Sequence, residues 1–327
     1  MKLSRRQFLP LAAGAAALPA ILRSASAQSY PSRPVRMIVP FAPGGQVDAI
    51  ARLVGQKLSE HFDRQFYVEN MSGAGGNIGM GRAAQSLPDG YTILVVEGTS
   101  FVGNPILYAK VPYDPYKDFD PITIAASTTQ LLTVNPSLPV RTARELAELI
   151  KAHPAKYSYS SPGLGTGGHL IGELFRMSLG LDLVHVPFPG AGPAVAATVA
   201  GHTPITFGSP ASSVGQVKDG KLRALAVASR KRLQALPDVP TMAEEGYPHI
   251  EANPWVGLLA PAATPKDIVT SLNREIVRAI ALAEIRERLA GLGFEPMAST
   301  PEDMAKLIRV EAEFWGKVIW AANIKAG

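Results

Sequence analysis

The sequence has 327 residues, enough for two domains of about 150 residues each. Hydrophobic residues make up 46% and charged residues 18% of the chain, a composition that indicates a globular fold and excludes a disordered protein. The chain has no cysteine, which excludes disulfides, thiolate nucleophiles and cysteine metal sites.

The first 27 residues have the features of an export signal. Lys2, Arg5 and Arg6 precede an apolar run that Gly and Pro interrupt, and residues 25–27 (ASA) offer a small-residue cleavage site. The string SRRQFL is typical of a twin-arginine signal, the route that exports folded proteins. A membrane anchor is disfavoured because the apolar run is shorter than the ~20 residues that a spanning helix needs. We therefore predict a signal peptide at 1–27 and a periplasmic mature protein.

Charge excludes one class of partner. Residues 1–27 carry four basic side chains and no acidic one, so the net charge of +5 falls to +1 without them. The remainder has no run of Lys and Arg that would neutralise a row of phosphates, so we expect no nucleic-acid partner. No later segment is long and apolar enough to cross a bilayer. We expect an exported, soluble monomer.

Strand-like and helix-like segments alternate along the chain. Apolar or alternating runs predict strands at 34–40, 64–70, 91–98, 118–126, 130–136, 156–163, 181–188, 204–210 and 222–229. Amphipathic patterns predict helices at 47–62, within 71–87 and 98–108, at 142–154, 166–180 and 189–201, a short one within 236–246, and two long ones at 265–290 and 301–322. Thr142 is the expected N-cap of its helix, with Glu145 three residues on. This alternation predicts crossover units and largely parallel sheets.

The pattern of elements restarts near residue 125, which indicates two α/β lobes. We place lobe 1 at 28–125 plus 251–327 and lobe 2 at 126–250, with the closing helices returning to pack on lobe 1. No linker rich in Ser, Gly or charge separates the lobes, so crossing strands should join them. Such strands act as hinges, and a ligand often lies between lobes of this kind.

The loops at the carboxyl ends of the strands are rich in Gly, Pro and Ser. In open parallel sheets this edge is where ligands bind. Bare backbone N–H groups and the positive end of a helix dipole hold a carboxylate or phosphate without Lys or Arg. One such turn by itself usually binds nothing, but several together favour an anion site. The loops are PGG (43–45), SGAGG (72–76), EGTS (97–100), SSPGLGTGG (160–168), PGAG (189–192) and GSPASS (208–213).

The stretch FAPGGQVDAI, residues 41–50, illustrates the expected chemistry. We expect the amides of Gly44, Gly45 and Gln46 to face one carboxylate. Asp48 should brace the first helical turn and pair with Arg52 four residues on.

SSPGLGTGGHL, residues 160–170, is the richest of these loops. Ser160, Ser161 and Thr166 add hydroxyl donors to the backbone ones. His169 lies near the first helical turn, where it is a candidate donor to an acid, although a lone His at such a place is more often a packing or capping residue.

Enzyme signatures are mostly missing. The sequence has no HExxH, GxSxG, SxxK or GxxxxGKS/T, and its six histidines show no metal-ligand spacing. We therefore predict no enzyme activity, no cofactor and no metal. One alternative stays open, an exported dinucleotide-dependent oxidoreductase: SGAGGNIG follows a strand, and Glu97 ends the next strand 22 residues after Gly75. Ile78 occupies the place of the third glycine, which weakens that signature.

Six stretches together resemble one family. In order and over nearly the whole mature chain, they closely resemble the Bug, or TctC-like, periplasmic solute-binding proteins of tripartite tricarboxylate transporters. The resemblance implies a type II periplasmic-binding-protein fold, α/β in class, with two doubly wound lobes around a ligand cleft. It also implies that one carboxylate of the ligand is held between two strand–turn–helix loops, often with ordered water. The stretches are VPFAPGGQVDAIAR, VENMSGAGGNIG, PDGYTILV, SSPGLGTGGHLIGELF, GKLRALAVASRKRLQALPDVPTMAEEGYP and WVGLLAPAATP.

On this sequence the resemblance implies a first loop at 41–48, an opposing loop at 160–169 and a third contact at 187–194. Thr206 stands where many members carry Asp, so a preference for amino acids is less supported. The implied partners are a small organic carboxylate and the integral-membrane permease subunits, with a sensor subunit for a membrane receptor as a further alternative. The expected ligand-binding residues are Phe41, Pro43, Gly44, Gly45, Gln46, Asp48, Gly98, Thr99, Ser100, Ser160, Ser161, Gly163, Gly165, Thr166, His169, Phe188, Gly190, Ala191, Gly208 and Ser209.

Overall fold

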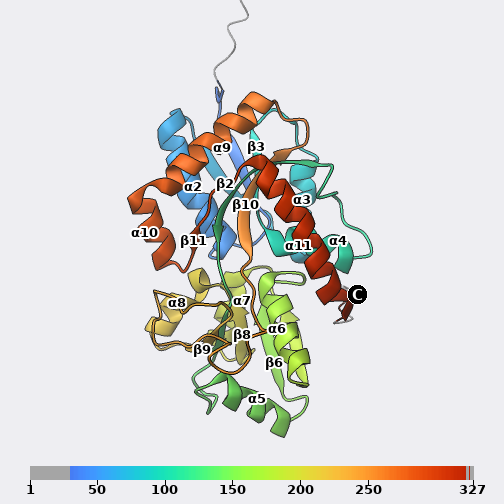
Figure 1. The fold of residues 1–327 in the computed structure, drawn as a ribbon, viewed down its shortest axis with the longest axis vertical. Coiled ribbons are helices and arrows are strands. Elements are labelled where there is room, and N and C mark those ends of the chain that lie inside the picture. Colours follow the sequence, from blue (N-terminus) through green and yellow to red (C-terminus); the bar gives the residue numbers. More distant parts are fainter. Residues whose placement is uncertain (1–29, 322–323, 325–327) are drawn as a thin grey trace, which may run out of the picture. The chain divides into compact units, whose positions relative to one another are not determined.

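A computed structural model describes residues 30–321 and residue 324 of the chain (Figure 1). The chain divides into two compact units, residues 1–32 and 33–327, and every helix and strand given below belongs to the second unit. The predicted signal peptide at 1–27 lies outside the described residues.

The strands of the second unit form two separate sheets. They are β1 (Val35–Val39), β2 (Phe66–Asn70), β3 (Thr92–Glu97), β4 (Phe119–Ser127), β5 (Leu131–Val134), β6 (Tyr157–Ser161), β7 (Leu183–Pro187), β8 (Ile205–Gly208), β9 (Arg223–Val227), β10 (Trp255–Pro261) and β11 (Glu295–Pro296). Sheet A has the order β11-β4-β10-β3-β1-β2, and sheet B has the order β7-β6-β8-β5-β9.

Helices follow most of the strands and pack on the two sheets (Figure 1). They are α2 (Gln46–Phe62), the short 3-10 helix η3 (Ala74–Gly76), α3 (Asn77–Ala84), α4 (Gly98–Leu107), α5 (Ala143–Ala152), α6 (Gly167–Ser178), α7 (Ala191–Val199), α8 (Pro210–Lys218), α9 (Lys266–Ala281), α10 (Ala283–Gly291) and α11 (Pro301–Ala321). We call sheet A with its helices the first lobe and sheet B with its helices the second lobe.

Both sheets are mixed, whereas the sequence predicts largely parallel ones. β1 pairs in parallel with β2 and β3, and β6 pairs in parallel with β7 and β8. β10 is antiparallel to β3 and β4, and β5 is antiparallel to β8 and β9. These two strands follow the segments that cross between the sheets, so each enters its new sheet against the direction of its neighbours. The short β11 is also antiparallel to β4.

The two crossing segments, 128–130 and 228–254, run between the sheets and bond to each other. Thr128 donates its N–H to the carbonyl of Pro254 at 2.9 Å, and Ala228 donates to the carbonyl of Gln130 at 2.8 Å. These paired segments form the connection that we call the hinge. The limits predicted for the lobes, near residues 125 and 250, stay a prediction.

β3 and β10, the two mostly apolar strands at the centre of sheet A, form the core of the first lobe. All six residues of β3 and all seven of β10 are buried, as expected for central strands that are covered on both faces. The C-terminal helix α11 packs on α4 and β4. The chain therefore ends by returning to the first lobe.

Three local predictions fail for identifiable reasons. The helix predicted at 265–290 is two helices, because Leu282 adopts an extended backbone (φ −61°, ψ 134°) between α9 and α10. The segment 236–246 forms turns instead of a short helix, since Pro237 and Pro240 each lack an N–H. GSPASS is the start of α8, with Pro210 at the first helical position, a place that favours Pro.

The cap predicted at Thr142 is confirmed. The hydroxyl of Thr142 accepts the N–H of Glu145 at 3.0 Å. The Glu145 carboxylate reaches back to the N–H of Arg141, so both ends of the turn are satisfied.

Candidate functional site

A small cavity lies where loops of both lobes and the hinge meet. Its volume is about 20 Å³, roughly the space of one water molecule. The first lobe contributes the start of α2 and the end of β3, the hinge contributes one residue, and the second lobe contributes the starts of α6, α7 and α8. We call this cavity the cleft; it is lined by Phe41, Ala42, Gly45, Gln46, Val47, Asp48, Glu97, Gln130, Pro162, Gly168, Ala191 and Ser209.

Three helices begin at the cleft without a side-chain cap. The N-caps of α2, α7 and α8 are Gly45, Gly190 and Ser209, and the side chain of none of them accepts a backbone N–H of its helix. The first N–H groups of a helix have no partner within it, and the helix dipole places partial positive charge there. The cleft therefore gathers helix-start donors from both lobes, mainly at α2 and α7 because Pro210 gives α8 no first N–H, and its lining contains no Lys or Arg.

Asp48 fixes the loop before α2. Its carboxylate accepts the N–H of Gly44 at 3.1 Å, bonds to Arg52 at 3.0 Å and 2.9 Å, and accepts the side-chain amide of Asn70 at 3.0 Å. Burial would raise the pKa of Asp48, but the hydrogen bonds from Arg52, Gly44 and Asn70 outweigh burial and lower it. The predicted brace and ion pair are confirmed. The Gly44 amide is used by Asp48, which leaves the amides of Gly45 and Gln46 at the cleft.

The hydroxyls of the 160–169 loop bond within the protein. Ser160 donates to the carbonyl of Ala194 at 3.1 Å, and Ser161 bonds to Nε2 of His185 at 2.6 Å. Thr166 donates to the carbonyl of Gly163 at 2.7 Å and caps α6. Of this loop, only Pro162 and Gly168 line the cleft.

His169 serves the same loop as an internal brace. Its Nδ1 accepts the N–H of Gly165 at 3.1 Å, and its ring stacks on His185 with the centroids 4.2 Å apart. Burial lowers the pKa of His169 to about 4 and that of His185 to about 3. Both imidazoles are therefore neutral at pH 7, and the bonds of His169 support the loop.

Six of the expected ligand-binding residues line the cleft. They are Phe41, Gly45, Gln46, Asp48, Ala191 and Ser209. Gly98, Thr99 and Ser100 instead form the buried first turn of α4, where a side chain on Gly98 would collide with the ring of Trp255. Ligand contacts of the expected residues outside this lining stay a prediction: Pro43, Gly44, Gly98, Thr99, Ser100, Ser160, Ser161, Gly163, Gly165, Thr166, His169, Phe188, Gly190 and Gly208.

Two polar residues of the cleft, Glu97 and Gln130, are not among the ligand-binding residues expected from the sequence. Glu97 is buried, and its Oε1 accepts the N–H of Gly167 in the opposite lobe at 3.0 Å. Burial raises the pKa of Glu97 to about 7. Gln130 lies in the hinge, and its Oε1 and the Oε1 of Gln46 are buried without a hydrogen-bond partner in the described part of the chain. In the sequence, Glu97 was noted only as an acidic residue at the end of a strand, a position that suggested contact with the ribose of a dinucleotide.

The loops of the two lobes touch beside the cleft. Ala42 donates its N–H to the carbonyl of Pro189 at 3.1 Å. A Cβ on Gly192 would lie 2.8 Å from the carbonyl oxygen of Pro43, and one on Gly190 would lie 2.9 Å from Ala42. These approaches require glycine, and they hold the cleft at its small volume.

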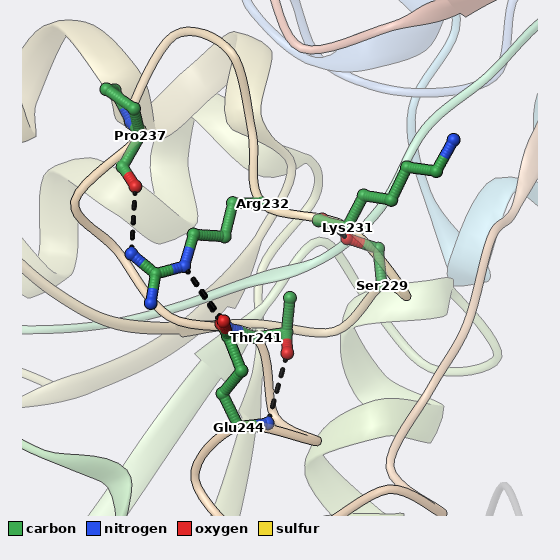
Figure 2. A network of polar contacts seen from close by, with 6 residues as sticks. All are labelled: Ser229, Lys231, Arg232, Pro237, Thr241 and Glu244. Carbon is green, nitrogen blue, oxygen red and sulfur yellow. Dashed lines mark hydrogen bonds and ion pairs between the residues drawn. The ribbon is translucent and has the colours of Figure 1, made fainter.

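A second, larger cavity is lined in part by residues of the hinge. We call this the hinge cavity; its volume is about 640 Å³ and its lining includes 127–129, 229–234, 253, 255, 290, 293–297, 307 and 311. Its basic loop is fixed by a polar network (Figure 2). Arg232 donates to the carboxylate of Glu244 at 2.9 Å and to the carbonyl of Pro237 at 3.1 Å. The N–H of Glu244 in turn donates to the hydroxyl of Thr241. Lys231 extends away from this network.

The described residues offer neither a metal site nor a membrane span. Among residues 30–321 no group of three His, Asp or Glu side chains is placed to hold a metal ion. None of the described helices combines the length and apolar character needed to traverse a lipid bilayer.

The fold and the cleft define a two-lobed binding protein. The chain belongs to the family described as "Tripartite tricarboxylate transporter family receptor" (TctC), whose pattern matches residues 50–324. The Bug and TctC-like resemblance is thereby confirmed. The chain is a solute-binding protein and not an enzyme, which overturns the oxidoreductase alternative.

Three solved structures show the similarity. The periplasmic binding protein BugD is 33% identical with a TM-score of 0.87, over 90% of this chain and 99% of that chain. R. palustris Rpa4515 with adipate is 35% identical with a TM-score of 0.88, over 90% and 99%. MatC from Rhodopseudomonas palustris with bound malate is 32% identical with a TM-score of 0.84, over 89% and 100%. The expected type II periplasmic-binding-protein fold is confirmed.

Proposed function

We propose that this protein captures a small organic carboxylate in the cleft and delivers it to the membrane permease subunits of a tripartite tricarboxylate transporter. The observation that carries the proposal is the meeting of three uncapped helix starts, from both lobes, at one cavity. Backbone N–H groups at helix starts bind anions through charge-assisted hydrogen bonds. The relatives that hold adipate and malate support the same ligand class.

The binding cycle follows from the size of the cleft. A cavity of about 20 Å³ holds no dicarboxylate, so the ligand binds while the lobes are apart. Closure then brings the starts of α7 and α8 towards the carboxylate already held at α2. The hinge at 128–130 and 228–254 is the part of the chain whose backbone turns during this motion.

The export of the protein belongs to the same proposal. The twin-arginine signal at 1–27 would send the folded chain to the periplasm, where its relative BugD is a binding protein. Lobe 1 would then comprise 28–125 plus 251–327, and lobe 2 would comprise 126–250.

A thermal-shift screen tests the ligand class. Mono-, di- and tricarboxylates, aromatic acids and NAD are each added to the ligand-free mature protein, and a ligand that binds the folded state raises the melting temperature by mass action. We expect at least one carboxylate to raise it and NAD to leave it unchanged. A shift with NAD and with none of the acids would contradict the proposal.

A second experiment tests delivery. The gene for this protein and its permease genes are expressed together, and uptake of the carboxylate found in the screen is measured with and without the binding protein. We expect uptake only with both. Uptake that does not depend on the binding protein would favour a sensing role.

A further inference from the structure

Glu97 joins the two lobes across the cleft. It is the last residue of β3 in sheet A, and it accepts the N–H of Gly167, the first residue of α6 in the second lobe. Thr166 already caps α6 by accepting the N–H of His169. Glu97 therefore places a carboxylate of the protein itself on a helix start that the sequence assigned to the ligand.

Other side chains pack closely around the contact between Glu97 and Gly167. A Cβ on Gly167 would lie 2.7 Å from Oε1 of Glu97 and 3.1 Å from Nε2 of Gln130, so any other residue there would displace the ends of these side chains. The side chain of Gln46 also bonds to Glu97. Because Gln46 and Gln130 each keep a buried Oε1 without a partner among residues 30–321, acceptor oxygens gather around Glu97. At the start of α6 the N–H of Gly167 is thus taken by Glu97 and the N–H of His169 by Thr166, so an ionised ligand group competes there with a carboxylate of the protein.

We propose that Glu97 is a positioning residue: it occupies the start of α6 in place of a ligand group, directs the ligand carboxylate to the start of α2, and makes binding take up a proton. This inference rests on the proposed carboxylate-binding function of the cleft. Glu97, Gly45 and Gln46 line the same small cavity, so a carboxylate held by the α2 amides lies close to that of Glu97. Two like charges in one buried site cannot both stay ionised at low cost.

The hydrogen-bond partners of Asp48 and Glu97 determine which of these two carboxylates takes up the proton. Asp48 lines the same cavity, but its ion pair with Arg52 keeps it ionised. Within the described part of the chain, the donors to Glu97 are the neutral groups of Gly167 and Gln46, and burial raises its pKa to about 7. The ligand charge raises that pKa further. The affinity therefore falls as the pH rises above about 7, and binding near this pH takes up a proton at Glu97.

Two other titratable groups lie around Glu97. Glu311 on α11 has its pKa raised to about 7, mainly by burial and also by the charge of Glu97, but it lines the hinge cavity instead of the cleft. His169 on α6 has its pKa lowered to about 4 by burial and stays neutral across the range of interest. Glu311 is therefore the matched control, since it has a similar pKa and lies outside the cleft.

Calorimetry measures the proton directly. Malate and adipate are titrated separately into the wild type, Glu97→Gln and Glu311→Gln at pH 7.5, each in buffers of different ionisation enthalpy. We expect the wild type and Glu311→Gln to take up about half a proton or more per ligand, and Glu97→Gln to take up none. Gln keeps an acceptor for the Gly167 amide, so the variant isolates the charge.

A measurement without ligand tests the cross-lobe contact. Hydrogen exchange of the Gly167 amide is compared in the wild type, Glu97→Gln and Glu97→Ala. We expect exchange to become at least about tenfold faster in Glu97→Ala and to stay slow in Glu97→Gln, because only Ala removes the acceptor. Absence of heat with both acids in every buffer would count against the proposed function, while hydrogen exchange of the Gly167 amide still tests the cross-lobe contact. Unchanged exchange in Glu97→Ala, or unchanged proton uptake in Glu97→Gln, would overturn the inference.

Discussion

The hinge cavity is much larger than the cleft, yet the lining of the cleft is the better match for a ligand carboxylate. The hinge cavity, at about 640 Å³, falls within the range of small-molecule sites, whereas the cleft, at about 20 Å³, holds little more than a water molecule. However, the cleft gathers helix starts from both lobes, and the hinge cavity gathers exposed basic side chains that already pair with acidic neighbours. The comparison teaches that the chemistry of the lining, and not its volume, identifies the site.

The largest expected effect comes from filling the cleft. Gly45 has φ −95°, which any residue adopts, and a Cβ added there would lie 3.3 Å from the Cβ of Ala191, so a longer side chain would extend towards Ala191. We expect Gly45→Leu to weaken carboxylate binding by about 100-fold or more, with the fold intact. Calorimetry measures the affinity, and circular dichroism measures the fold.

Gly215→Leu is the matched control, because Gly215 lies in α8 with open space around it. We expect this variant to bind within about twofold of the wild type. Equal affinity in both variants would remove the α2 loop from the site.

The next effect comes from holding the lobes apart. A methyl group on Gly192 would lie 2.8 Å from the carbonyl oxygen of Pro43, so Gly192→Ala should prevent full closure. We expect about tenfold weaker binding and a larger radius of gyration with ligand in X-ray scattering. Gly215→Ala is the control. A Gly192→Ala protein that closes like the wild type would show that this contact does not limit closure.

As the pH is lowered, we expect the cleft loop at 160–169 to loosen before the hinge-cavity loop at 229–241. The 160–169 loop of the cleft depends on the neutral His169 and His185, whose pKa values burial lowers to about 4 and about 3. Their ordinary pKa is 6.5, so stability is lost as the pH falls below about 6.5. The loop of the hinge cavity depends on the Arg232–Glu244 pair, where the hydrogen bond from Arg232 lowers the pKa of Glu244.

We therefore expect hydrogen exchange near pH 5 to rise in 160–169 before it rises in 229–241. The loop at 229–241 should loosen only below the ordinary pKa of Glu244, which is 4.5. The opposite order would mean that the histidines do not support the cleft loop.

The smallest expected effect lies in the hinge cavity. Lys231 extends away from the Arg232 network, and its charge is the feature that would attract an anion to this cavity. At physiological salt we expect Lys231→Ala to change carboxylate affinity by less than about twofold. A loss of tenfold or more would place the anion in the hinge cavity and reverse the comparison.

The sequence predicted the local parts of the site and missed those that depend on distant partners. The turn before α2 and the roles of Asp48 and Arg52 follow from residues within a few positions of each other. Glu97 meets Gly167, which lies 70 positions further along the chain, so no local pattern shows the contact. Likewise, Ser160 and Ser161 read as ligand donors, but the fold brings the carbonyl of Ala194 to Ser160 and the ring of His185 to Ser161 as hydrogen-bond partners.

The fold was predicted better than the site for a related reason. Strand and helix patterns are local and repeat along the chain, and the Bug-like stretches cover most of it. The direction of β10 and β5 depends on how the chain returns through the hinge, which neither periodicity nor turn chemistry encodes. Good helix formers lie on both sides of Leu282, so the sequence pattern predicts one continuous helix. The extended backbone of Leu282 instead separates α9 from α10.

A crystal structure of the mature protein with malate or adipate tests the central claim most directly. We predict a carboxylate oxygen within about 3.2 Å of the backbone nitrogens of Gly45 and Gln46, with the lobes closed over it and the hinge cavity free of ligand. A ligand bound among the basic side chains of the hinge cavity, with the starts of α2, α7 and α8 left uncontacted, would contradict the account.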